Sequence, residues 1–297
     1  MTSPRKSVLI TGCSVGGIGS ALAETFQERG YHVFATLRTP SKISPRLSAA
    51  AAENVTILQL DVTSPDSIAA AVASVKAKTG GRGLDVLVNN SGRTQVLAAL
   101  DTPLDEARAL FDLNFWAPLA MVQAFAPLLI EARGCLVNNT SVGAYMPMPF
   151  SSIYVSSKAA LAMASNTWQR ELAPLGIRTI TLITCGVKTK AFDNVEAPKI
   201  PADSYYHVIR DYLTGLVDGG QMQAGSMDAH RYARDVVRAV ERGAEGEIWA
   251  GKDAFMARLG SLFFPRSILN MVLDGIMHVS PELAKVEQHM QAGKKIR

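Results

Sequence analysis

The sequence has few of the features that mark specialised classes of protein. Its three cysteines, Cys13, Cys135 and Cys185, are too few and too scattered for a disulfide framework or a zinc site. The five histidines form no metal-ligand pattern, so we expect no metal. The sequence has no uncharged run of about 18 apolar residues, so it predicts no transmembrane helix. Residues 1–12 lead directly into a strand pattern, so we expect no signal peptide and an intracellular, cytoplasmic location.

Charged and aromatic residues are also scarce. Of the 297 residues, 19% are charged and 7% aromatic, whereas 48% are hydrophobic. This composition excludes a disordered chain, a collagen and a coiled coil, and it predicts a globular protein with a sizeable core. The formal net charge of +4 fits either an anionic ligand or scattered surface lysines. No run of Lys and Arg contains interleaved aromatic residues, so we expect no nucleic-acid partner.

Short β-branched runs alternate with longer helical patterns up to about residue 250. The strand patterns are Ser7–Thr11, His32–Leu37, Val55–Asp61, Leu84–Asn89, Cys135–Thr140, Ile177–Thr184 and Glu247–Ala250. The helix patterns are Ile18–Arg29, Pro65–Lys78, Pro103–Arg133, Ser152–Ala173 and Asp228–Arg242. This order predicts a doubly wound α/β Rossmann fold with a mainly parallel, seven-stranded sheet and helices on both faces. We expect residues 1–252 to form this single domain.

Two segments interrupt the alternation. Residues 188–227 are polar but include Phe192, Tyr205, Tyr206 and Tyr212, so we expect either a lid over an apolar substrate or a surface loop. Residues 253–297 form an apolar C-terminal extension that packs on the domain or on a membrane surface. Within it, 253–280 carries Phe255, Leu259, Phe263 and Phe264. These residues either close a pocket or a subunit contact, or form an amphipathic helix on a lipid surface.

The first strand pattern runs into a glycine-rich turn, TGCSVGGIG at residues 11–19, which begins a helix. Glycines let the backbone approach a pyrophosphate, and a helix N-terminus favours its negative charge. The second strand pattern ends without the carboxylate that would bind a ribose 2′-hydroxyl, and Arg38 stands there instead. The turn predicts a dinucleotide site, and Arg38 favours NADP(H) over NAD(H). The alternative is that Arg38 is a solvated loop residue.

Polar residues also follow the third and fourth strand patterns. Asp61 lies where open α/β sheets bind ligands, so it can accept a hydrogen bond from an adenine amino group or cap the next helix. Asn89, Asn90 and Gly92 lie at the same predicted sheet edge. Their side chains and backbone either tie strands together or line the cofactor.

The sequence NTSVGAYMPMPFSSIYVSSKAA at residues 139–160 combines a serine, a tyrosine and a lysine. Tyr154 and Lys158 are four residues apart in a helix pattern, so they share one face. A nearby ammonium group stabilises a phenolate and lowers its pKa. Such a pair can give a proton to a carbonyl while hydride arrives at carbon. Ser141, thirteen residues before Tyr154, can hydrogen-bond the same oxygen.

In order and spacing, these motifs resemble the short-chain dehydrogenase/reductase superfamily over residues 6–252. The resemblance implies a catalytic site of Ser141, Tyr154 and Lys158, with Asn114 holding a water that links Lys158 to a proton relay. It implies an NADPH/NADP site, for which the expected contacts are Gly12, Ser14, Gly17, Ile18, Gly19, Arg38, Asp61, Val62, Asn90, Gly92, Tyr154, Lys158, Gly186, Val187 and Thr189. We expect substrate contacts from Tyr145 and Phe150, and a homo-oligomer.

The sequence departs from the family pattern at three places. The glycine turn has one extra residue, Ser91 stands in place of the usual alanine, and Cys185 replaces the usual proline before Gly186. Cys185 either loosens that loop or presents a thiol near the nicotinamide.

A narrower resemblance is to the 1-acyldihydroxyacetone-phosphate reductase-like branch. It lies in GGIG, FSSIYVSSKAA, GVKT with a later SYY, and the apolar tail. This resemblance implies NADPH-dependent reduction of a carbonyl on a fairly apolar, lipid-like substrate, and peripheral contact with a lipid surface through 253–280. A tailoring ketoreductase of a natural-product pathway, a retinol- or steroid-type dehydrogenase and a non-catalytic NADP-binding sensor are the alternatives.

Overall fold

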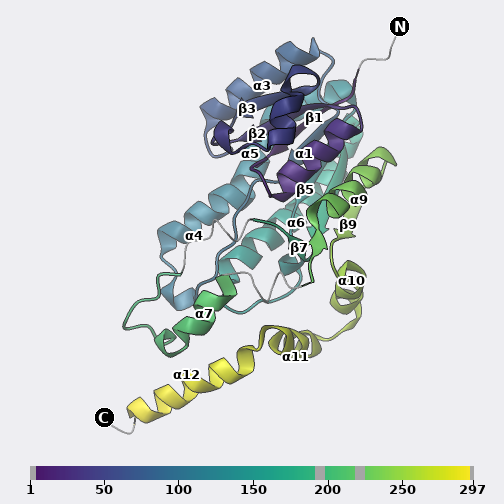
Figure 1. Cartoon of the computed structure of the whole chain (residues 1–297). Helices are drawn as coiled ribbons and strands as arrows, with labels where there is room; N and C mark the ends of the chain where they lie inside the picture. Colours follow the sequence, from purple (N-terminus) through teal and green to yellow (C-terminus); the bar gives the residue numbers. More distant parts are fainter. Residues whose placement is uncertain (1–4, 191–197, 218–224, 295–297) are drawn as a thin grey trace.

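The computed structural model describes residues 5–190, 198–217 and 225–294, and it has a three-layer α/β architecture (Figure 1). Seven strands form one sheet in the order β3-β2-β1-β4-β5-β6-β9, and every neighbouring pair is parallel. The strands are β1 Ser7–Thr11, β2 His32–Leu37, β3 Val55–Gln59, β4 Val86–Asn89, β5 Cys135–Asn139, β6 Arg178–Thr184 and β9 Gly246–Ala250. The predicted Rossmann fold is therefore confirmed. A short separate ladder pairs β7, Val187–Lys188, with β8, Met227–Asp228.

Helices cover both faces of the sheet. The α-helices of the described residues are α1 Ile18–Glu28, α2 Pro45–Ala49, α3 Pro65–Thr79, α4 Leu104–Phe111, α5 Ala117–Ala132, α6 Ser152–Leu172, α7 Arg210–Val217, α9 Ala229–Glu241, α10 Ala254–Phe263, α11 Arg266–Met277 and α12 Val279–Lys294. The first face packs against α1 and α9, and the second against α3, α5 and part of α6. Strand residues alternate between these two apolar clusters: Ile10 and Val88 belong to the first, and Leu9 and Leu87 to the second.

The predicted helix over Pro103–Arg133 is interrupted in the structure. A π-helical turn at Asp112–Trp116 separates α4 from α5. It lies at Asn114, whose fully buried side chain is drawn into hydrogen bonds with the loop after β4 and with α6. By length and composition alone, the helical stretch Leu104–Ala132, which includes the π-helical turn, could cross a membrane. In this structure α5 packs on the sheet instead.

The described part of the predicted lid packs together with the C-terminal extension. Residues 198–217 contain a 3₁₀ turn at His207–Ile209 and α7, and α12 lies beside them (Figure 1). A third apolar cluster joins Val96 and Phe150 to α7 and to Met277 and Val279 of the extension, and the Tyr212 hydroxyl donates to the Met277 carbonyl at 2.9 Å. Phe192 lies outside the described residues.

The phenylalanines of the extension, which the sequence predicts to cover an apolar region, are not the side chains that the extension buries. Phe255 and Phe263 are 71% and 73% exposed, and Phe264 is also exposed. The buried residues of the extension come mostly from α11, namely Leu269, Leu273 and Met277, together with Gly260 of α10 and Val279 of α12. α10 turns its phenylalanines to solvent, so they do not cover the cluster.

Candidate active site

The glycine turn has the geometry of a phosphate cradle. Gly12 has φ of +75°, which glycine adopts readily. A Cβ on Gly19 would lie 2.6 Å from Asn90 Nδ2 and would also collide with the Gly12 carbonyl, so only glycine lets α1 start this close to β1. Gly17 caps α1 without a side-chain hydrogen bond. The first N–H groups of α1, including those of Ile18 and Gly19, can therefore receive an anion.

Two neighbouring segments brace the extra residue of this turn. Ser14 forms a β-bridge with Ile43, and the Val15 N–H donates to the Lys42 carbonyl at 2.8 Å. On the other side, the Lys190 N–H donates to the Gly16 carbonyl at 3.0 Å. The longer turn is thus held between the loop after β2 and the segment after β6. The latter segment also contains the predicted cofactor residues Gly186, Val187 and Thr189, whose contact with a cofactor stays a prediction.

Arg38 and Asp61 lie at the ends of neighbouring strands β2 and β3. Arg38 is exposed, and its positive charge contributes to the lowered pKa of the Asp61 carboxyl. The larger causes of that lowered pKa are the hydrogen bonds from the Thr63 hydroxyl, at 2.7 Å, and the Thr63 N–H. Ser64 rather than Asp61 caps α3, and Val62 is buried. Asp61 therefore stays ionised and free of the capping role that was its alternative.

Asn90 and Gly92 lie between the glycine turn and α6, the helix that carries Tyr154 and Lys158 and is called the Tyr–Lys helix below. Asn90 Nδ2 donates to the Thr11 carbonyl at 2.8 Å, so this side chain ties β4 to β1. Of the two roles that the sequence predicts for this side chain, the structure shows the one that ties strands together. A contact between Asn90 and a cofactor stays a prediction. A Cβ on Gly92 would lie 3.3 Å from Lys158 Nζ and 3.0 Å from Asn114 Oδ1. Gly92 therefore lets the loop pass close to the lysine.

Ser141, Tyr154 and Lys158 come together at the carboxyl edge of the sheet. Burial raises the pKa of the Tyr154 phenol, and its interaction with the Ser141 side chain opposes that rise. Lys158 is buried, which lowers its pKa to about 8, and its Nζ donates to the Asn139 carbonyl at 3.0 Å. The expected lowering of the Tyr154 pKa by Lys158 is not seen here: burial raises this pKa, and the Ser141 hydrogen bond, not Lys158, is what opposes the rise. At neutral pH the pair therefore consists of a protonated phenol and an ammonium group.

The Asn114 side chain connects two segments of the site by hydrogen bonds. Asn114 Oδ1 accepts from the Arg93 N–H at 3.0 Å, and Nδ2 donates to Ser157 Oγ at 3.0 Å. These bonds connect the loop after β4 to α6, one residue before Lys158. The water relay implied for Asn114 stays a prediction.

The two predicted substrate contacts have different surroundings. The Tyr145 hydroxyl donates to the Glu247 carboxylate, and its ring lies 5.0 Å from that of Trp249. A substrate that needed this hydroxyl as a hydrogen-bond donor would have to displace Glu247. Phe150 has a φ of +59° and packs edge-on against Tyr206 at 5.7 Å between ring centroids. Phe150 thus lies in the apolar cluster beneath the described part of the predicted lid.

The structure gives no support to a reactive thiol at Cys185. This thiol is buried, and burial raises its pKa to about 12, so it stays protonated. Among residues 5–190, 198–217 and 225–294, no group of His, Cys, Asp and Glu side chains could hold a metal ion.

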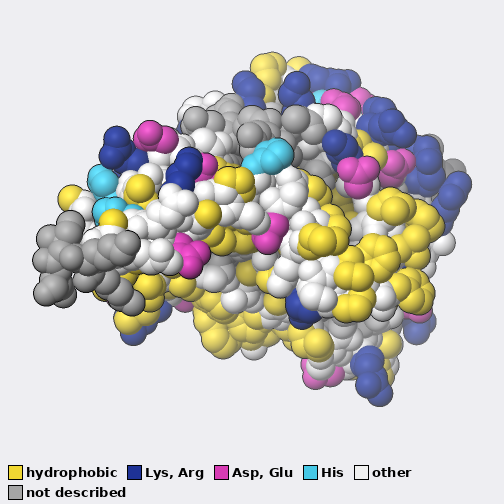
Figure 2. Space-filling view, turned by 90° about the horizontal axis from the view of Figure 1, so that it is seen from below, with side chains coloured by type: hydrophobic (Ala, Val, Ile, Leu, Met, Phe, Trp, Pro, Cys, Tyr) yellow, Lys and Arg dark blue, Asp and Glu magenta, His cyan; other side chains and the backbone are white. Residues whose placement is uncertain are grey.

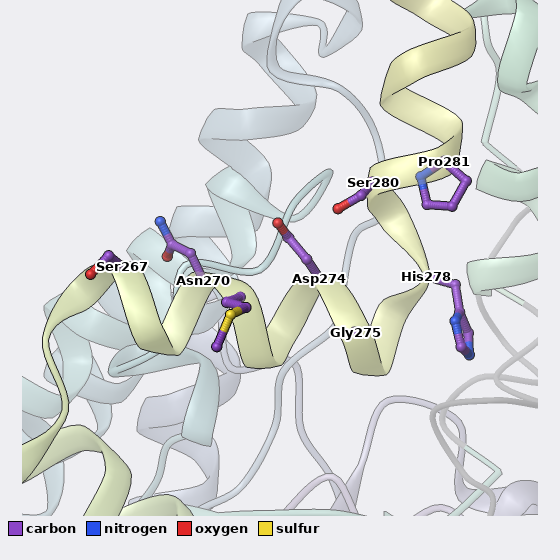
Figure 3. A pocket seen from close by; sticks show the side chains of 8 residues that line it. Ser267, Asn270, Asp274, Gly275, His278, Ser280 and Pro281 are labelled. Atoms are coloured by element: carbon purple, nitrogen blue, oxygen red, sulfur yellow. The ribbon is translucent and has the colours of Figure 1, made fainter.

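An open groove of about 630 Å³ lies between α11 and the start of α12 (Figure 3). Its lining residues are Ser267, Asn270, Met271, Asp274, Gly275, His278, Ser280 and Pro281. None of them is a predicted site residue, so this groove is separate from the Tyr–Lys helix.

Sequence reasoning missed Asn139 and Thr184. Asn139 is buried at the end of β5, where it contacts Lys158, Asn90 and Thr184. The available signal was the tetrapeptide LVNN, which recurs at 87–90 and 136–139, close to the ends of the fourth and fifth strand patterns.

Comparison with known proteins gives consistent matches over most of the chain. The family model for short chain dehydrogenases matches residues 6–199. Short-chain dehydrogenase ptmH of Penicillium ochrochloron is 40% identical over 268 residues, which cover 90% of this chain and 96% of the relative. An NADPH-dependent 1-acyldihydroxyacetone phosphate reductase of Schizosaccharomyces pombe is 38% identical over 212 residues, or 70% of each chain.

A solved structure agrees with these matches. A short chain dehydrogenase from Burkholderia cenocepacia J2315, in complex with NADP, has a TM-score of 0.69 and 25% identity, and the match covers 91% of this chain and 97% of that one. The resemblance seen in the sequence motifs is confirmed.

Proposed function

This chain belongs to the short-chain dehydrogenase family, and we propose that it is an NADPH-dependent reductase of a ketone or aldehyde on a fairly apolar substrate. As a member of this family it is an oxidoreductase that acts on CH–OH or C=O groups. The observation that carries the proposal is the grouping of Ser141, Tyr154 and Lys158 at the sheet edge that also holds the glycine turn.

Each side chain of this group has a distinct role in the proposal. Bound NADPH would supply the hydride. The Tyr154 hydroxyl donates a proton to the carbonyl oxygen, and its raised pKa keeps it protonated for that step. Ser141 Oγ holds the same oxygen by a hydrogen bond. The Lys158 ammonium stabilises the phenolate that remains, below a pH of about 8.

The residues around the turn fit a phosphorylated dinucleotide. The glycine cradle and the open N-terminus of α1 suit a pyrophosphate. Arg38 is exposed at the end of β2, where a guanidinium suits a 2′-phosphate. NADP in the Burkholderia cenocepacia structure and the NADPH dependence named for the Schizosaccharomyces pombe relative support this choice.

The apolar cluster beside the Tyr–Lys helix supports an apolar substrate. Phe150, four residues before Tyr154, packs under Tyr206 and Tyr212. We infer that the described part of 188–227 covers the substrate, and that α11 and α12 hold this cover from outside through Met277 and Val279. A lipid-like carbonyl compound is the class that best fits this surrounding.

The outward face of α10 and α11 supports contact with a lipid surface. Phe255, Met256, Leu262, Phe263, Phe264, Ile268, Met271, Val272 and Ile276 are all exposed. Figure 2 shows the molecule from below, and hydrophobic side chains gather over a broad part of this face. Apolar area of this extent marks an interaction site. Flotation with vesicles of anionic phospholipid tests the contact, and a concentration-dependent dimer without flotation would assign the face to a second copy of the chain.

Cofactor oxidation on a panel of carbonyl compounds tests the proposed reaction. We expect NADPH consumption with aldehydes and ketones, at rates that rise with the apolar size of the substituent. A fluorescence titration with NADPH on the same protein separates two failures. Binding without turnover on any carbonyl would favour the sensor alternative, whereas absence of binding would reject the cofactor assignment.

A further inference from the structure

The tetrapeptide LVNN recurs at the ends of the adjacent strands β4 and β5. It occupies 87–90, of which Asn90 lies one residue beyond β4, and 136–139 at the end of β5; Asn89 is paired with Asn138, and Asn90 contacts Asn139. Successive side chains of a strand point to opposite faces of the sheet. The two asparagine pairs therefore form two amide ladders, one on each face.

The first ladder, Asn89–Asn138, lies on the face covered by α5 and α6. Asn89 Nδ2 donates to Asn138 Oδ1 at 3.0 Å, and Asn138 Nδ2 donates to Ser165 Oγ at 2.9 Å. Asn138 and Ser165 are completely buried. This ladder ties the strands to the middle of α6, two turns beyond Lys158. Within the described part of the chain, this ladder makes no hydrogen bond to Ser141, Tyr154 or Lys158.

The second ladder, Asn90–Asn139, lies on the face of α1 and α9. Asn139 Nδ2 donates to Asn90 Oδ1 at 2.9 Å, and Asn139 Oδ1 accepts from the Thr184 hydroxyl of β6. Asn90 Nδ2 reaches the Thr11 carbonyl beside the glycine turn. At the other end, Thr184 Oγ1 lies 2.6 Å from the hydroxyl of Tyr232, a completely buried residue of α9. Both polar atoms of the Asn139 side chain are thereby held.

Both ladders contact α6, but among the described residues only the second one contacts Lys158, and it does so through the backbone carbonyl of Asn139. Lys158 Nζ donates to the Asn139 carbonyl at 3.0 Å. We propose that Asn139 is a positioning residue, whose anchored side chain fixes the carbonyl that holds the Lys158 ammonium and ties it to the cofactor turn. This inference rests on the proposed role of Lys158 in carbonyl reduction.

The physical reason lies in the burial of Lys158. Burial is the cause of its lowered pKa, and no charged side chain among the described residues contributes. Tyr154, which is also titratable, lies one turn earlier on the same helix. A hydrogen bond to the charged form favours that form, so the Asn139 carbonyl preserves the ammonium. Without the amide side chain, the end of β5 is free to relax between Asn90 and Thr184. The ammonium then loses part of this support.

The two ladders provide a matched pair of variants, Asn139→Ala and Asn138→Ala. Both remove a buried amide from the same strand, but only Asn139 holds the carbonyl under Lys158. We expect Asn139→Ala to lower the Lys158 pKa by about half a pH unit or more. The alkaline limb of the pH profile of kcat/KM should move down with it. NMR titration of the lysine side chain, in protein with ¹³C-labelled lysine, measures the pKa directly.

Asn138→Ala should lower the melting temperature and leave both the lysine titration and the alkaline limb in place. Equal shifts in the two variants, or no shift in Asn139→Ala, would overturn the proposal. If either alanine variant fails to fold, Thr184→Val and Thr184→Ser give a second comparison. Valine removes the hydroxyl that Asn139 Oδ1 accepts from and should lower the Lys158 pKa, whereas serine keeps the hydroxyl and should preserve it.

The two proposals fail in different ways. If no carbonyl compound consumes NADPH, the proposed reaction is wrong, but the NMR titration still decides the role of Asn139. If turnover is normal and the lysine titration is the same in wild type, Asn139→Ala and Thr184→Val, the positioning role is wrong while the reaction stands.

Discussion

The carboxyl edge of the sheet and the C-terminal extension depart in opposite ways from the usual distribution of side chains. Polar side chains usually lie at the surface of a protein and apolar ones inside it. At the sheet edge, polar groups are buried: Asn114 and Asn138 are 0% exposed, and each has hydrogen-bond partners. On α10, apolar groups are exposed: Phe255 and Phe263 keep more than two thirds of their surface in contact with solvent. Buried amides need exact partners and fix atoms in place, whereas exposed apolar side chains constrain nothing inside the molecule. Chemistry is therefore expected at the first region and association at the second.

The largest expected effect comes from Tyr154→Phe at the sheet edge. Loss of the phenolic proton should lower the turnover of carbonyl reduction by about 10²-fold or more, the usual scale of general acid catalysis. NADPH binding, followed by fluorescence, should persist. Tyr31→Phe is the matched control, because Tyr31 precedes β2 at the opposite edge of the sheet and packs against Phe26 in the core. Near-full activity of Tyr154→Phe would contradict the assigned proton donor.

The next effect tests how the same edge distinguishes its cofactors. A charge-assisted hydrogen bond is worth roughly 1.5–3 kcal/mol, so Arg38→Ala should weaken NADPH binding by about 10- to 100-fold. NADH affinity should change little, because NADH has no 2′-phosphate. Isothermal titration with both cofactors measures the difference, with Arg108→Ala as a surface-arginine control. Equal losses for the two cofactors would show that Arg38 does not contact the phosphate.

Removal of the extension tests whether the second region also serves the site. A chain that ends at Gly251 lacks Met277 and Val279, which pack on the cluster with α7 and Phe150. Burial of one such side chain is worth roughly 1.5–3 kcal/mol, so KM for a large apolar ketone should rise about 10-fold while that for acetone stays nearly unchanged. Circular dichroism checks that the sheet domain remains folded. A milder variant in the full chain, Met277→Ala, should raise the KM for the large ketone by less and again leave the KM for acetone nearly unchanged.

The smallest expected effect separates the two regions by stability. Phe263→Ser on α10 should change the free energy of unfolding by less than about 0.5 kcal/mol, because this side chain is already in water. Leu182→Ala in β6, a completely buried position, should cost about 2–5 kcal/mol. Urea unfolding measures both. A large loss for Phe263→Ser would mean that α10 is covered in solution, for example by a second copy of the chain.

Local patterns in the sequence carried most of the fold and the main groups of the site. Strands β1 and β2 begin and end as predicted, because a run of β-branched residues between polar or glycine residues has defined ends. The glycine turn and the Tyr154–Lys158 spacing were readable for a similar reason. Each depends on a few residues within one turn or one helix face, and needs no knowledge of distant segments.

The tertiary structure decided how these pieces were held and where the remaining side chains went. The interruption of the helix at Asn114 follows from bonds to Arg93 and Ser157, which are distant in sequence. Tyr145 turns to Glu247, which lies 102 residues away.

In the C-terminal extension, too, the sequence predicted one part and the tertiary structure decided the rest. Its apolar composition was evident in the sequence, but only packing against α7 selected Met277 for burial and left Phe263 exposed. The sequence by itself determined the strand–helix order and the chemical groups of the Tyr–Lys helix, because those depend on local periodicity. The partners of Asn139 and the covered face of the extension depend on contacts between distant segments, which only the folded chain brings together.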